Sequence, residues 1–188
     1  MESIGLVLLV LVAGHFLNAF IIWFTHLLLH QRILGIPLYR IHLGAHHRID
    51  YVDDYVLDVS SAVEHLTWAG FTVLVSSTYL LLFPLWIAVI LVGELLLSIA
   101  WSYYLHMEYE NPNSRLARFK WYQYGLALHK LHHGYRPEAD SGTGRHEAFH
   151  RSVNYSFGGP VLGALMDRLF GTYLGADVRI ENKQTTAT

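Results

Sequence analysis

Three long apolar stretches constrain the fold of this chain more than any other feature of its sequence. A helix needs about 20 apolar residues, at a rise of 1.5 Å each, to cross the hydrocarbon core of a bilayer. Residues 4–29 and 85–105 meet that length, and residues 66–83 are just long enough. None of the three has the polar face that a helix of a soluble bundle would show. The sequence therefore predicts an all-α integral membrane protein with at least three spans.

The composition agrees with a chain embedded in lipid. Hydrophobic residues make up 53% of the 188 residues and charged residues 15%, against roughly 25% charged in an ordinary soluble domain. The formal net charge of −2 leaves no basic field for nucleic acid. The absence of cysteine excludes disulfides, thiolate zinc sites and iron–sulfur clusters. The length fits a single domain, residues 1–188.

The flanking residues predict how the spans are arranged. The first stretch follows Glu2 instead of a positive start, so we expect a retained span and not a signal peptide. Pro84 separates the second and third stretches, which predicts a helical hairpin. Basic residues follow the first and third spans, so the positive-inside rule places both connections and the C-terminus in the cytoplasm and the N-terminus on the opposite side. These basic residues are Arg32, Arg40, Arg48, Arg115, Arg118 and Lys120.

The remaining sequence predicts a helical cap on the cytoplasmic side. Residues 117–133 mix aromatic side chains with lysine, which is typical of an interfacial or re-entrant helix and raises the count to three or four membrane helices. Residues 159–173 predict one short amphipathic helix that ends at Gly171. The polar tail, residues 181–188, is expected to be disordered.

Thirteen histidines are the second distinctive feature, and eight of them fall in three clusters. Residues three or four apart lie on one face of a helix, so each cluster can turn two imidazoles toward one ion. The second histidine of each consecutive pair, His47 or His133, is turned about 100° round the helix and could reach a second ion. Eight imidazoles exceed the ligand set of a single ion. The spacing therefore predicts two metal ions sharing one cytoplasmic cap. The clusters are His26-Leu-Leu-Leu-His30, His42-Leu-Gly-Ala-His46-His47 and His129-Lys-Leu-His132-His133.

Further side chains are candidates for the same site. His106 ends the third span at the depth of the clusters, and we expect it to be a ninth ligand. Glu110, one turn later, is expected either to coordinate or to orient an imidazole. His146 and His150 have ligand spacing and either complete the site or belong to a solvated loop, whereas His65 is expected to be an interfacial residue.

The donor type narrows the metal. Imidazole without thiolate suits iron, copper, zinc and nickel. A redox-active pair of iron ions fits reaction chemistry beside a bilayer best. Structural zinc is the alternative, but a closed site of four ligands would leave several histidines unexplained.

Polar residues inside the predicted spans pose a separate question. His15, Asn18 and Glu94 each lie 11–12 residues from a cytoplasmic histidine, roughly 16–18 Å above the metal plane at helical rise. Polar groups at that depth are paired or functional. We expect the three to form one polar cluster, which either lines a substrate cavity or clamps two helices together.

The order HxxxH, HxxxHH, single His, HxxHH resembles the membrane fatty acid hydroxylase/sterol desaturase superfamily. Residues 154–158 (NYSFG) and 167–173 (DRLFGTY) are similar to the closing NYG…WDRLFGTY signature of that superfamily, with Met166 where tryptophan is usual. The resemblance covers roughly residues 20–175. The chain departs from the pattern in the second cluster, which has three residues before its histidine pair where two are more usual, and near His106, where Glu110 replaces a second histidine.

The resemblance implies a di-iron oxygenase that hydroxylates, or desaturates, an unactivated C–H bond of a lipid-type substrate. It implies O2 as co-substrate and a separate electron donor of the cytochrome b5 or ferredoxin type. Asp167 would be a structural residue of the signature, bonded to a ligand histidine. Because imidazoles bind metal only when neutral, activity is expected to fall towards about pH 6. A histidine-rich metal-binding or transport protein and a membrane haem protein are the alternatives.

Overall fold

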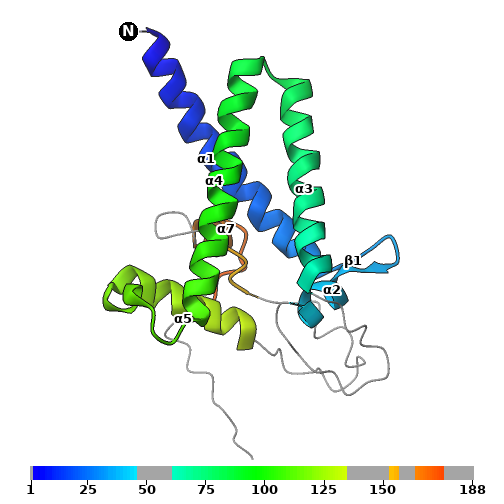
Figure 1. The fold of residues 1–188 in the computed structure, drawn as a ribbon, viewed down its shortest axis with the longest axis vertical. Helices are drawn as coiled ribbons and strands as arrows, with labels where there is room; N and C mark the ends of the chain where they lie inside the picture. Colours follow the sequence, from blue (N-terminus) through cyan, green and yellow to red (C-terminus); the bar gives the residue numbers. More distant parts are fainter. Residues whose placement is uncertain (1, 46–60, 135–152, 157–163, 176–188) are drawn as a thin grey trace, which may run out of the picture.

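A computed structural model describes residues 2–45, 61–134, 153–156 and 164–175. Its three long helices are α1 (Glu2–Leu29), α3 (Ser61–Leu82) and α4 (Leu85–Glu110). Each is long and apolar enough to cross a membrane, so the prediction of a helical membrane protein with three spans is confirmed. Helices α3 and α4 form an upright hairpin, and α1 crosses it obliquely (Figure 1).

Pro84 lies at the turn between α3 and α4, where the sequence predicts a turn. Pro84 is the N-cap of α4, and its carbonyl accepts hydrogen bonds from Ile87 N at 2.9 Å and Ala88 N at 3.0 Å. Proline is tolerated at a helix start because the first amide groups there have no partner inside the helix. Helix α4 continues five residues beyond the predicted span and so carries His106 within its last two turns.

Helices α1 and α4 cross in very close contact. A Cβ atom added to Gly14 would lie 2.6 Å from the Leu91 side chain, so any larger residue there would force that side chain to move. One turn further along α1, the Asn18 side chain donates to the Leu91 carbonyl at 3.0 Å. Small residues and side-chain hydrogen bonds are the usual means of joining helices in lipid.

The predicted polar cluster inside the membrane lies at this crossing. His15 Nδ1 is 2.5 Å from the Glu94 carboxylate, which also accepts from Ser98 Oγ at 2.7 Å and from the Asn18 amide. Tyr79 of α3 donates to Asn18 Oδ1 at 2.6 Å. The network joins all three spans, which confirms that His15, Asn18 and Glu94 meet and favours the helix clamp. Their role in a substrate cavity stays a prediction.

A short hairpin that the sequence did not predict follows α1. Strands β1 (Arg32–Ile33) and β2 (Ile36–Pro37) pair antiparallel. The two turn residues, Leu34 and Gly35, have φ values of 49° and 84°, as in the turns that match the twist of paired strands. The hairpin reverses the chain so that α2 (Leu38–Ala45) returns toward the end of α1.

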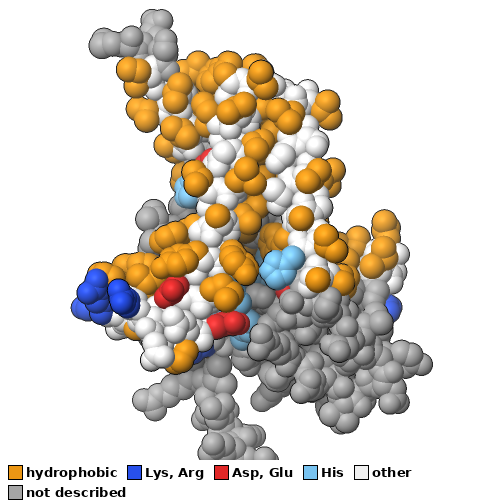
Figure 2. Space-filling view, in the orientation of Figure 1, with side chains coloured by type: hydrophobic (Ala, Val, Ile, Leu, Met, Phe, Trp, Pro, Cys, Tyr) orange, Lys and Arg blue, Asp and Glu red, His pale blue; other side chains and the backbone are white. Residues whose placement is uncertain are grey.

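Helix α5 (Lys120–Gly134) lies across the lower end of α4 after the 3-10 turn η1 (Arg115–Arg118) (Figure 1). Tyr122 donates to the Glu108 carbonyl at 2.5 Å, and a Cβ atom on Gly125 would meet the hydroxyl of Tyr109. Lysine and arginine gather at the start of α5, whereas hydrophobic side chains cover the spans above (Figure 2). A helix therefore covers most of the predicted range, residues 117–133, and its place at the membrane interface stays a prediction.

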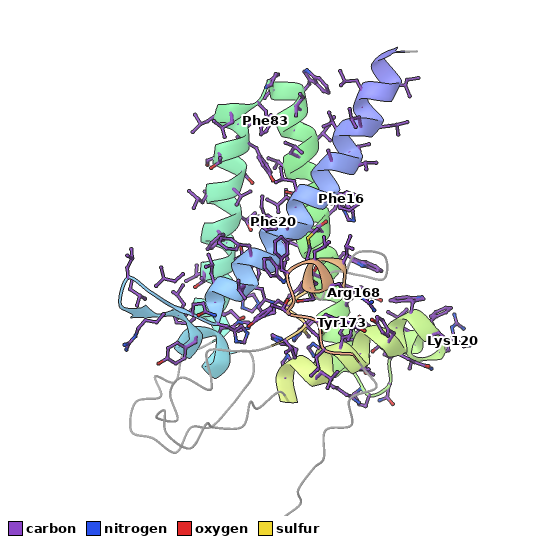
Figure 3. The ribbon with its side chains drawn as sticks, turned by 180° about the vertical axis from the view of Figure 1, so that it is seen from behind. Phe16, Phe20, Phe83, Lys120, Arg168 and Tyr173 are labelled. Carbon is purple, nitrogen blue, oxygen red and sulfur yellow. The ribbon has the colours of Figure 1, made fainter. Side chains whose placement is uncertain are left out.

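The last described segment packs on α1. Helix α7 (Leu165–Leu169) lies within the helix predicted over residues 159–173 and ends two residues before Gly171; residues 159–163 of that range lie outside the described part. Phe170 stacks on Trp23 with ring centroids 4.5 Å apart. Arg168 lies over the ring of Tyr173 at 4.1 Å, and the two labelled side chains adjoin in Figure 3. The predicted disordered tail, residues 181–188, also lies outside the described residues.

Candidate metal centre

Seven histidines of the described residues gather into two groups below the spans. The nitrogen atoms of each group lie within 4.8 Å of one another. The first group draws on α1, α2 and α5, and the second on α4 and α5. The first group is His26, His30, His42 and His132, and the second is His106, His129 and His133.

The first group is buried and has spacings that suit one ion. His26 and His30 are one turn apart at the end of α1, with ring centroids 5.5 Å apart. His42 of α2 brings its Nε2 to 3.0 Å from the Nε2 of His26. Two imidazole nitrogens bound about 2.1 Å from one ion at a right angle lie about 3.0 Å apart. The observed separation therefore fits two ligands of the same ion.

Backbone carbonyls orient two of these imidazoles. His26 Nδ1 is 2.8 Å from the carbonyl oxygen of Tyr155, and His132 Nδ1 is 2.6 Å from that of Val153. A carbonyl only accepts, so each Nδ1 carries the hydrogen and donates. In the neutral ring Nε2 then presents its lone pair, which is the form that binds a metal.

A carboxylate orients a third imidazole of the first group, that of His42. His42 Nδ1 donates to Glu64 Oε1 at 2.8 Å, and both side chains are buried. A carboxylate bonded to the far nitrogen fixes the ring and makes it a stronger ligand. The sequence analysis did not identify Glu64 as part of the site, because an acidic residue in the first turn of a helix is usually solvated. The one sequence feature that could have identified it is its position at the depth of the histidines.

The second group is assembled by two helices. His129 and His133 are one turn apart on α5, with ring centroids 4.2 Å apart, and the ring of His106 lies 4.6 Å from that of His129. Burial, and then the neighbouring histidines, lower the pKa of His129 to about 2 and that of His133 to about 4. Both rings are therefore neutral near pH 7. Glu110 Oε1 is 3.9 Å from His106 Nε2, beyond hydrogen-bond distance.

The two groups adjoin each other. His132 and His133 are consecutive on α5, belong to different groups, and have ring centroids 5.7 Å apart. The third cluster is thus divided between two sites, as predicted for consecutive histidines that point in different directions round a helix. His129 shares its group with His133, four residues on, and not with His132, three residues on. One helix holds both groups in a fixed relation.

Asp167 lies behind the first group. It bonds no histidine among the residues that the structure describes. Its buried carboxylate accepts from Trp23 Nε1 at 3.1 Å and from Thr172 Oγ1 at 2.6 Å. It also accepts from the amides of Tyr155 and Ser156, each at 2.9 Å. Burial raises the pKa of Asp167, and these hydrogen bonds oppose that rise.

The remaining candidates are placed only in part. His65 is exposed beside the ring of Tyr103, with centroids 5.9 Å apart, and belongs to neither group. Four predicted ligands or candidate ligands lie outside the described residues. These are His46, His47, His146 and His150.

Comparison with protein families agrees with this geometry. The model of the fatty acid hydroxylase family matches residues 11–172, which include both histidine groups and Asp167. Neither the curated proteins nor the solved structures provide a match. Because the family model covers most of the chain, the protein belongs to the fatty acid hydroxylase family, within the membrane fatty acid hydroxylase/sterol desaturase superfamily.

Proposed function

We propose that the chain is a membrane-bound non-haem di-iron oxygenase. It hydroxylates, or desaturates, an unactivated C–H bond of a lipid-type substrate with O2 and two electrons from outside the chain. The observation that carries this proposal is the pair of adjoining all-histidine groups at the ends of membrane spans, in a chain of the hydroxylase family.

The donor set fits two iron ions. Seven imidazoles in groups of four and three exceed what one ion binds, and imidazole without thiolate suits iron. When bound, iron supplies the oxygen chemistry that no amino-acid side chain provides. The proposed ligands are the two described groups together with His46 and His47; Glu110, His146 and His150 are candidates to complete the set.

The chain keeps its ligands neutral, dry and correctly turned. The four histidines of the first group are at most 2% exposed, which excludes water from the ligand nitrogens. The carbonyls of Val153 and Tyr155 and the Glu64 carboxylate fix three of the rings. Preorganised ligands of this kind cost little rearrangement when the metal binds.

An apolar path on α1 suits a substrate that arrives through the bilayer. Phe16, Phe20 and Phe24 repeat every fourth residue and lie on one face of α1, two of them labelled in Figure 3. Phe20 packs against Phe170 of α7, with ring centroids 5.5 Å apart. This aromatic row reaches the depth of His26, which lies two residues beyond Phe24 and on a different side of α1. We propose the row as the surface along which an apolar chain approaches the metal groups.

The remaining assignments follow from the sequence. We place both histidine groups and the C-terminus in the cytoplasm and the N-terminus on the opposite side, because the basic residues adjoin the histidine end of the spans. Electrons come from a separate donor of the cytochrome b5 or ferredoxin type.

A histidine-rich metal transport or binding protein is the alternative. Transport needs polar groups along a path through the bilayer. In the part of the chain that the structure describes, the polar cluster at mid-span is bonded within itself and joins three helices. That arrangement favours a clamp over a conduit.

The test compares lipids of a host that produces the wild-type chain with those of hosts producing His132→Ala or His65→Ala. We expect an oxygenated or desaturated lipid with wild type and His65→Ala only, and its formation should require O2. Equal lipid profiles in all three hosts, with each protein present in the membrane and loaded with iron, would contradict the proposal.

A further inference from the structure

The segment of residues 153–156 connects the first histidine group to Asp167 through a single peptide unit. Its carbonyl half, at Tyr155, accepts the hydrogen of His26 Nδ1 at 2.8 Å. Its amide half, at Ser156, donates to Asp167 Oδ2 at 2.9 Å. The two bonds form one chain that runs from the buried carboxylate, through the peptide, to the imidazole.

Hydrogen bonds in such a chain strengthen one another. A carboxylate that accepts from the N–H of a peptide draws positive charge to that end and leaves the carbonyl oxygen more negative. The carbonyl is then a better acceptor, and the bonded imidazole becomes a more basic ligand at Nε2. Burial of His26, Tyr155 and Asp167 keeps the effective dielectric low, which enlarges the effect.

The Asp167 carboxylate also holds residues 153–156 at a fixed distance from α1. Trp23 lies one turn before His26 on α1, and its indole nitrogen donates to Asp167 Oδ1 at 3.1 Å. Asp167 Oδ1 also accepts from the Tyr155 amide at 2.9 Å. One side chain therefore holds the helix that carries the histidine and the segment that carries its acceptor.

We infer that Asp167 is a positioning residue that fixes the tautomer and strengthens the basicity of His26 through the peptide unit between Tyr155 and Ser156. It does for His26 indirectly what Glu64 does for His42 by direct contact. The inference rests on the proposed function only in taking Nε2 as a metal ligand. The tautomer itself is a property of the metal-free protein.

His132 gives an internal comparison with the same geometry and no carboxylate. Its Nδ1 donates to Val153 at 2.6 Å, and the amide half of that peptide unit, at Asn154, donates to the Thr172 carbonyl at 2.9 Å. This second chain ends on a neutral group. Removing the charge of Asp167 should therefore weaken the bond of His26 and leave that of His132 unchanged.

The test is nitrogen-15 NMR of labelled histidine in the metal-free, full-length protein, comparing wild type with Asp167→Asn. We expect the His26 Nδ1 proton to move to a weaker hydrogen bond and to exchange faster, with the His132 signal in place. A packing role alone would disturb both signals together, because the segment binds both. Movement of both, or of neither in a folded variant, overturns the inference.

A second variant covers the case in which Asp167→Asn does not fold. Thr172→Val removes one hydrogen bond of the carboxylate and keeps its charge and the Thr172 carbonyl. A change confined to the His26 signal supports the proposed role of Asp167. Equal changes in the His26 and His132 signals, or no change in either, overturn it. Metal affinity of the first group, measured separately by titration, should fall several-fold in Asp167→Asn. If the His26 signal changes as expected but the wild-type protein forms no product, the oxygenase proposal fails and the role of Asp167 stands.

Discussion

Replacing Glu64 should weaken one metal site and spare the other. The Glu64 carboxylate accepts from His42 Nδ1 at 2.8 Å, with the two side chains 7% and 1% exposed. Such a charged, buried bond contributes about 1.5–3 kcal/mol and a neutral one about 0.5–1.5 kcal/mol. Glu64→Gln keeps an acceptor and loses the charge, so we expect a loss of about 1–1.5 kcal/mol, roughly 10-fold in affinity. Glu64→Ala loses the whole bond and should cost nearer 100-fold.

Equilibrium dialysis with metal analysis measures both sites at once. In Glu64→Gln, the second histidine group should bind its ion with wild-type affinity. The first histidine group, which contains His42, should bind its ion about 10-fold more weakly. Glu108→Gln is the matched control, because the Glu108 carboxylate accepts from Ser114 at the end of α4 and contacts no histidine among the described residues. Equal weakening of both ions, or an unchanged affinity in Glu64→Ala, would refute the reasoning.

Three other changes test different parts of the structure. Gly125→Ala places a methyl group against the hydroxyl of Tyr109 in α4 and should destabilise the protein by about 1–3 kcal/mol. Gly93→Ala, where the added methyl group meets open space, should not. Thermal unfolding in detergent compares the two variants. Asn18→Leu removes bonds to two helices and should lower the unfolding temperature without changing metal content. Burial lowers the pKa of His129 and His133, so calorimetry at pH 6 should show almost no proton release from them on metal binding, although an unshifted imidazole is about three-quarters protonated there.

The same pKa shifts change the expected pH dependence. Below about pH 6.5 the unfolded chain takes up protons that the buried histidines of the folded chain do not, so the metal-free protein should lose stability as the pH falls from about 6.5 to about 4. Metal should be retained through pH 6, whereas the sequence led us to expect that activity falls as the pH drops towards about 6. Metal analysis after dialysis at a series of pH values tests this, and loss of both ions by pH 6 would contradict it.

The spans and the location of the site could be predicted, because length, apolar composition and charge act locally. Helix α1 and the turn at Pro84 follow from the sequence alone. The end of α7 at Leu169 did not, since the sequence pattern placed it two residues later, at Gly171. Helix geometry predicted that His132 and His133 would serve different ions, because consecutive side chains point in different directions. That His129 joins the group of His133 and not that of His132 depends on tertiary packing.

The partners that orient the imidazoles were harder to foresee. Two are backbone carbonyls, at Val153 and Tyr155, and a carbonyl leaves no mark in a sequence. Glu64 is one of 15 acidic residues, and its burial beside His42 is seen only in the structure. Asp167 was expected to bond a ligand histidine directly, and it reaches His26 through a peptide unit instead.

The most direct test of the account is the iron content of the purified, full-length protein with two matched variants. The two histidine groups predict two irons per chain for wild type. His132→Ala should lose iron from the first group and His133→Ala from the second, so each variant should retain about one iron. One haem per chain, a single closed zinc ion, or loss of both irons in either variant with the fold intact would contradict the central claim of two adjoining histidine sites.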